Sequence, residues 1–148
     1  MNWQNGINDF QLFLKIERGL SSNTIENYAR DLKKLIVFLK VNEIDISPIA
    51  IDENILQQFI YETAKKVAVR SQARIISGLR SFFDYLIFED YRTTNPTDLI
   101  ETPKLGVKLP DTLSIEEINT IIAAIDLRHP QGERNRTMLE TMYSCGLR

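Results

Sequence analysis

Apolar residues recur at intervals of three or four along most of the chain, and this helical periodicity constrains its fold more than any other feature. Short polar stretches separate one periodic segment from the next. No segment shows the strict alternation of apolar and polar residues that is typical of a half-buried strand. We therefore predict an all-α protein.

The first hundred residues contain four periodic segments. We predict helices over about residues 5–18, from Ser22 or Asn23 to about Lys40, from an N-cap at Asp52 to near Lys65, and over about residues 70–89. The second helix should bury Ile25, Tyr28, Leu32, Leu35, Ile36 and Leu39, and the fourth Ile75, Leu79, Phe82 and Leu86. Asn95 and Pro96 can start a further short helix. Residues 1–102 are thus predicted to form one domain of four or five helices.

The stretch ETPKLGVKLPDT follows this domain and contains two prolines, a glycine and two lysines, a composition typical of a linker between domains. We assign the linker to residues 103–112. Beyond it, Ser114 and Glu117 have the spacing of a capping box, and a last helix is predicted from about Gln131 to Cys145, with Gly146 at its end. Residues 113–148 are too few to fold without outside help, since domains under about 40 residues usually need it. We expect them to be part of a second domain.

Composition limits the classes of function. With 43% hydrophobic and 26% charged residues, the chain can bury a core, and it has no apolar run of the length of a membrane span, about 18 residues, and no secretion signal. Cys145 is the single cysteine and His129 the single histidine. We therefore expect a cytoplasmic protein without disulfide, metal, other cofactor, small-molecule ligand or membrane partner.

The distribution of charge is more informative than its sum. The net charge is −2 and the isoelectric point is about 5.5, values that by themselves count against a nucleic-acid-binding protein. Between Glu62 and Asp84, however, the chain carries five basic residues and no acidic one. These are Lys65, Lys66, Arg70, Arg74 and Arg80.

Two polar stripes are predicted on the sides of the second and fourth helices opposite their apolar faces. The second helix presents Asn23, Asn27, Arg30 and Lys34, and the fourth presents Arg70, Arg74, Ser77 and Ser81. Arginine and lysine neutralise phosphates, and short polar side chains let a helix approach the DNA backbone or a base edge. A merely solvated helix face usually mixes the signs of its charges. We interpret the two stripes as a DNA-binding surface. Gly78 within the fourth helix is explained equally well by a close helix contact and by a nearby phosphate.

Four segments in order carry a resemblance to a known family: GLSSNTIENYARDL, RSQARIISGLRSFFDYL, NPTDLIETPKLGVKLPDTLSIEEI and RNRTMLETMYSCGLR. They resemble successive segments of the Xer-type tyrosine recombinases of the phage-integrase family, within their XerD-like branch. The resemblance implies a SAM-like core-binding domain, a linker that crosses the DNA, and a catalytic domain that begins near residue 110. It also implies that the second and fourth helices face the major groove of double-stranded DNA.

The chemistry implied by the resemblance is cleavage and rejoining of DNA through a 3′-phosphotyrosyl intermediate, without metal or nucleotide. Arg148 matches the first phosphate-binding arginine of the family. The family's lysine, His-x-x-Arg pair and nucleophilic tyrosine have no counterpart in the 148 residues. We therefore expect this chain to be a fragment that cannot recombine DNA alone.

In a complete enzyme, the resemblance implies resolution of chromosome dimers together with a second Xer-type recombinase subunit. Two alternatives stay open. One is an integrase or invertase of a mobile element. The other is a non-catalytic helical regulator, which either binds a protein or competes for the DNA site of a recombinase.

Overall fold

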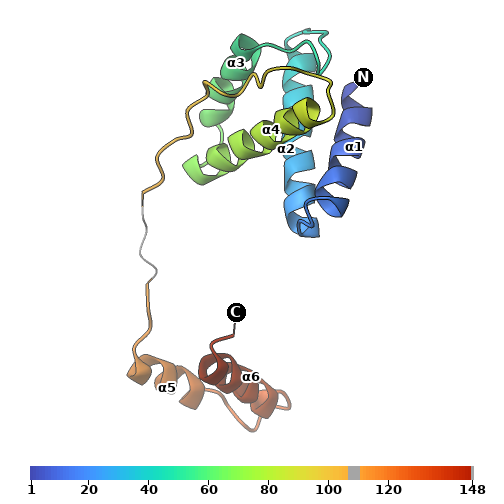
Figure 1. Cartoon of the computed structure of the whole chain (residues 1–148). Coiled ribbons are helices and arrows are strands. Elements are labelled where there is room, and N and C mark those ends of the chain that lie inside the picture. The colour runs from blue at the N-terminus through green and yellow to red at the C-terminus, as the bar shows by residue number, and fades with distance from the viewer. Residues whose placement is uncertain (107–110, 148) are drawn as a thin grey trace. The chain divides into compact units, whose positions relative to one another are not determined.

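The computed structural model describes residues 1–106 and 111–147, and within these ranges it contains six α-helices and no strand (Figure 1). The all-α prediction is confirmed. The chain divides into two compact units, Met1–Gly106 and Val107–Arg148. None of the helices in the described ranges is long and apolar enough to cross a membrane.

Four helices form the first unit. They are α1 (Trp3–Ile16), α2 (Ser22–Val41), α3 (Glu53–Ala64) and α4 (Val69–Phe88), within about two residues of the predicted ranges. The side chains of Asn2, Ser21 and Asp52 cap the first three by accepting a backbone amide. The predicted cap of α2, Ser22 or Asn23, was therefore wrong by at least one residue.

Helix α4 is central to the core of this unit. It packs on α1, α2 and α3, and the buried residues predicted for it are confirmed, together with Ile76 and Phe83. The rings of Phe82 and Phe10 of α1 form an edge-to-face pair with centroids 5.4 Å apart, and Phe82 stacks on Trp3 at 6.1 Å. Phe10 and Phe82 are fully buried, and a side chain of this kind stabilises the fold by about 1.5–3 kcal/mol. The orientation of α4, and of any residue on its outer side, is fixed by this packing.

Gly78 lies where α4 crosses α2. A Cβ atom added to Gly78 would lie 3.1 Å from Cδ1 of Tyr28, closer than side-chain atoms normally approach. The glycine thus allows the close contact of the two helices. Of the two explanations left open by the sequence, the structure supports helix packing.

The segment after α4 forms a turn, so the short helix predicted at Asn95 and Pro96 was wrong. The buried Asn95 side chain donates to Asp84 Oδ1 at 2.6 Å and to the Arg80 carbonyl oxygen at 3.3 Å. The Arg80 guanidinium in turn donates to the Ile100 carbonyl at 3.0 Å. These bonds to α4 hold the segment as a turn, and the unit has four helices.

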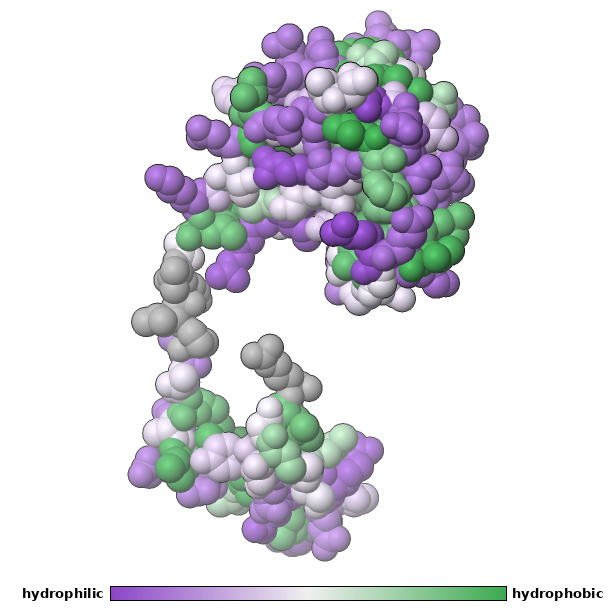
Figure 2. Space-filling model, viewed as in Figure 1, coloured by the Kyte–Doolittle hydropathy of each residue, from purple (hydrophilic) through white to green (hydrophobic). Residues whose placement is uncertain are grey.

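The second unit contains α5 (Ile115–Ala123) and α6 (Gly132–Cys145). The predicted capping box between Ser114 and Glu117 is present, and Gly146 ends α6 in the left-handed conformation with φ 61°. No hydrophobic side chain of either helix is buried, and Figure 2 shows apolar residues at the surface of this unit. The described residues of this unit contain no hydrophobic core.

Tyr85 makes the stability of the first unit depend on pH. Burial, with the nearby carboxylates Glu89 and Asp9, raises the pKa of its phenol from 10.0 to about 12. Because the folded pKa exceeds the unfolded one, this contribution is complete below pH 10 and is lost as the pH rises toward 12. We expect the free energy of unfolding to fall by roughly 2 kcal/mol over this range through Tyr85 alone.

Urea unfolding at several alkaline pH values, followed by circular dichroism, measures this loss. The variant Tyr85→Phe keeps the ring and lacks the titrating group, so its loss of stability should be smaller than that of the wild type. Parallel pH dependence of the two proteins would contradict the prediction.

Candidate nucleic-acid interface

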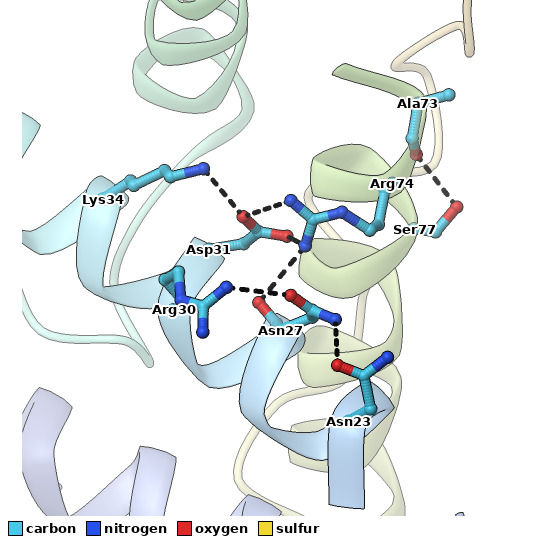
Figure 3. A network of polar contacts seen from close by, with 8 residues as sticks. All are labelled: Asn23, Asn27, Arg30, Asp31, Lys34, Ala73, Arg74 and Ser77. Carbon is cyan, nitrogen blue, oxygen red and sulfur yellow. Dashed lines mark hydrogen bonds and ion pairs between the residues drawn. The ribbon is translucent and has the colours of Figure 1, made fainter. Parts of the chain in front are cut away.

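The two predicted polar stripes meet at Arg74, where α2 and α4 pack against each other (Figure 3). The guanidinium of Arg74 on α4 reaches α2, where it donates to the carbonyl oxygen of Asn27 at 3.4 Å and to the carboxylate of Asp31. We call the eight predicted residues the α2/α4 face. They are Asn23, Asn27, Arg30, Lys34, Arg70, Arg74, Ser77 and Ser81.

Asp31 is the organising residue of this face, and sequence reasoning missed it. Its side chain is completely buried, yet it carries a carboxylate. Both Nη atoms of Arg74 donate to it, Nη2 at 3.2 Å, and Lys34 Nζ lies 3.1 Å from Oδ1 (Figure 3). A buried carboxylate requires such partners, since an unpaired buried charge costs several kcal/mol. The signal was present in the spacing, because Asp31 is three residues after Tyr28 and four before Leu35, at the edge of the apolar stripe.

Arg74 was predicted on the outward side of the fourth helix, and the structure places its guanidinium against α2. Its side chain is 35% exposed, and its guanidinium is bound to the buried Asp31. Lys34 shares the same carboxylate, with 41% of its side chain exposed. Both cations thus lie at the α2/α4 face but are paired with an acid within the protein.

The remaining polar residues of α2 form a surface chain of hydrogen bonds. Asn27 Nδ2 donates to Asn23 Oδ1 at 3.2 Å, and Arg30 Nη1 donates to Asn27 Oδ1 at 3.1 Å. These bonds fix the orientation of the Asn27 amide. Arg30 is exposed and its partner is neutral, so its positive charge stays available to an anion.

On α4, only the first of the predicted residues is a free cation. Arg70 is exposed and has no ion-pair partner among the described residues. Ser77 is exposed as well, with its Oγ donating to the Ala73 carbonyl at 3.0 Å. Ser81 is half-buried in a hollow that Glu17 and Asp84 also line. Ser81 therefore lies beside two carboxylates, and its contact with DNA stays a prediction.

The candidate catalytic residue, Arg148, lies outside the described residues. The single cysteine, Cys145, and the single histidine, His129, are both exposed in the second unit. His129 Nδ1 accepts the backbone amide of Gln131 at 3.2 Å, which is a local contact of the turn before α6.

Comparison with known proteins assigns the family. Residues 7–90 match the family model described as the phage integrase N-terminal SAM-like domain, and the chain belongs to this family. Among curated relatives, it is 42% identical to the tyrosine recombinase XerD of Staphylococcus saprophyticus over 146 residues. It is 42% identical to that of Staphylococcus epidermidis over 143 residues, and 38% identical to that of Staphylococcus aureus over 146 residues.

Each of these alignments covers 96% of this chain and 48% of the relative, so the chain spans about half the length of the curated relatives it matches. The resemblance to the XerD-like branch of the Xer-type tyrosine recombinases is confirmed.

Arg74 and Arg70 should differ in their effect on stability. We expect Arg74→Ala to lower the free energy of unfolding by about 2 kcal/mol, because it removes the main partner of a buried carboxylate. Arg70→Ala should change it by less than about 0.5 kcal/mol, as is usual for exposed positions. Urea titrations of both variants measure the difference, and equal effects would show that the Asp31 pair is not formed in solution.

Proposed function

We propose that the Met1–Gly106 unit binds duplex DNA through the α2/α4 face. The observation that carries the proposal is the pair of exposed cations without an ion-pair partner among the described residues, Arg30 on α2 and Arg70 on α4, two helices that pack against each other. Membership of the phage-integrase family and the names of the relatives support it.

The residues of the face suit the two parts of DNA recognition. Arg30 and Arg70 are the principal phosphate contacts, which position a protein on the duplex without reading its sequence. Asn23 is exposed and its amide nitrogen is free to donate, and asparagine amides pair well with adenine in the major groove. The Asn27 amide, already bonded at both ends, supports these neighbours.

For a protein of the relatives' full length, we propose a site-specific tyrosine recombinase that cuts and rejoins DNA through a 3′-phosphotyrosyl intermediate. Residues 113–148 would then begin its catalytic domain, after a linker at 103–112, and Arg148 would bind the phosphate under attack. A transition state with charge on the phosphate oxygens requires positioned donors of this kind. Resolution of chromosome dimers with a second Xer-type subunit is the proposed role, supported by the XerD relatives.

The proposal predicts a definite salt dependence for DNA binding by the full 148-residue chain. Each phosphate contact contributes a slope of about −0.9 to the plot of log affinity against log salt concentration. We expect the double variant Arg30→Gln/Arg70→Gln to lose about 1.8 of this slope and to bind more weakly. Fluorescence anisotropy with a labelled duplex of random sequence measures both quantities.

A matched control is Lys15→Gln, which removes one charge from an exposed position on α1, outside the α2/α4 face. Its slope should stay close to that of the wild type. If the double variant and the control lose equal amounts, the face is not the binding surface. Binding that is insensitive to salt would instead favour an apolar protein interface.

A further inference from the structure

We infer that Asp31 is a positioning residue of the proposed interface, which holds Arg74 and Lys34 away from the DNA phosphates and so limits sequence-independent affinity. The inference rests on the proposed function, but the two can fail separately. Its basis is one buried carboxylate, bound by two cations from two helices, within a face that otherwise presents unpaired positive charge.

The four cations of the face fall into two classes. Arg30 bonds to a neutral amide, and Arg70 has no ion-pair partner among the described residues. Arg74 and Lys34 instead share the carboxylate of Asp31, so these three groups together carry one net positive charge rather than two. A phosphate that approaches this cluster is attracted by half of the charge that its two cations would present alone.

Geometry adds a second restraint on Arg74 and Lys34. Asp31 takes one donor of Lys34 and a donor from each Nη atom of Arg74, so a phosphate can bond only the donors that remain unless a cation leaves the carboxylate. The carboxylate cannot turn to water instead, because its side chain is wholly buried. An unpaired buried charge is strongly unfavourable, so the two cations stay with Asp31 when DNA approaches. Their side chains are 35% and 41% exposed, so a phosphate could reach them if Asp31 lost its charge.

This arrangement has a consequence for recognition. Phosphate contacts supply the binding energy that a protein has for any DNA sequence, whereas base contacts distinguish one site from another. Because Asp31 holds two of the four cations, the part of the binding energy that is independent of sequence is smaller than it would be if all four cations contacted phosphates. Asp31 thereby favours discrimination over affinity.

The variant Asp31→Asn tests the inference, because it removes the charge and keeps the size of the side chain. In the full 148-residue chain, we expect tighter binding to a random-sequence duplex at low salt. The slope of log affinity against log salt concentration should be steeper by about 0.9 to 1.8, for one or two released cations. Stability should fall at the same time, since the ion pair is lost.

A positioning role predicts that the salt dependence of DNA binding becomes steeper while the stability falls. If Asp31 were merely structural, the stability would fall and the salt dependence would stay the same or become shallower. Asp31→Glu restores the charge and should return the slope toward the wild-type value. An unchanged or shallower slope in a folded Asp31→Asn protein would overturn the inference.

A second experiment leaves Asp31 in place and compares substitutions of two side chains that reach the surface, Arg30 and Lys34. In the wild-type background, Arg30→Gln should reduce the slope by about 0.9, and Lys34→Gln by less than half as much. Equal losses would overturn the inference even if Asp31→Asn does not fold. If the wild-type chain shows no salt-dependent binding to duplex DNA, the proposed function itself fails.

Discussion

Where α4 crosses α2, the backbone of Gly78 lies against the ring of Tyr28, and Arg74 closes the contact by binding the buried Asp31. The first of these contacts allows the helices to approach closely, and the second joins them by charge. A carboxylate without access to water has to keep its cations, so the ion pair restricts how the helices slide or rotate past each other. Because both polar stripes are carried by these helices, the same contact that builds the core also determines the spacing of Arg30 and Arg70. The proposed DNA-binding surface therefore depends on how α2 and α4 pack as much as on which residues the two helices carry.

Signals that are local in the sequence were sufficient to predict the helices of the first unit. Periodicity placed all four helices of the first unit and the buried stripe of α4, because an amphipathic helix is stabilised by the face it buries. Of the two errors, one occurred where contacts between residues distant in sequence decide the outcome, and the other in a choice between neighbouring caps. At Asn95, the side chain bonds to Asp84 of α4 and leads the chain into a turn, although Asn-Pro is a good start for a helix. At the start of α2, adjacent serines are equivalent as caps by type, and the structure uses Ser21.

The candidate site was predicted less completely, for a physical reason. Periodicity tells which residues share a helix face, but it does not tell which partner on another helix a long side chain reaches. Arg74, Arg80 and Arg92 all turn inward to oxygen atoms that are 20 or more residues away along the chain. For Arg92, which binds the carbonyls of the loop before α3, burial even lowers the pKa of the guanidinium. The stretch between Glu62 and Asp84, which has no acidic residue, thus contains the exposed Arg70 together with Arg74 and Arg80, which bond inward. Only the three-dimensional contacts distinguish Arg70 from the other two.

The same contacts explain how a chain with a net charge of −2 can present a surface suited to DNA. At physiological salt, charges further apart than about 8 Å are largely screened, so a phosphate responds to the nearest side chains and not to the sum over the protein. Near α2 and α4, the acid that matters is Asp31, since it lies directly beneath two of the four cations. Its buried position makes its charge less screened than that of a surface carboxylate, and its effect on Arg74 and Lys34 correspondingly stronger. A single acidic residue can therefore set the attraction of the face for phosphate more effectively than the bulk charge does, and this is the physical reason to regard Asp31 as part of the interface.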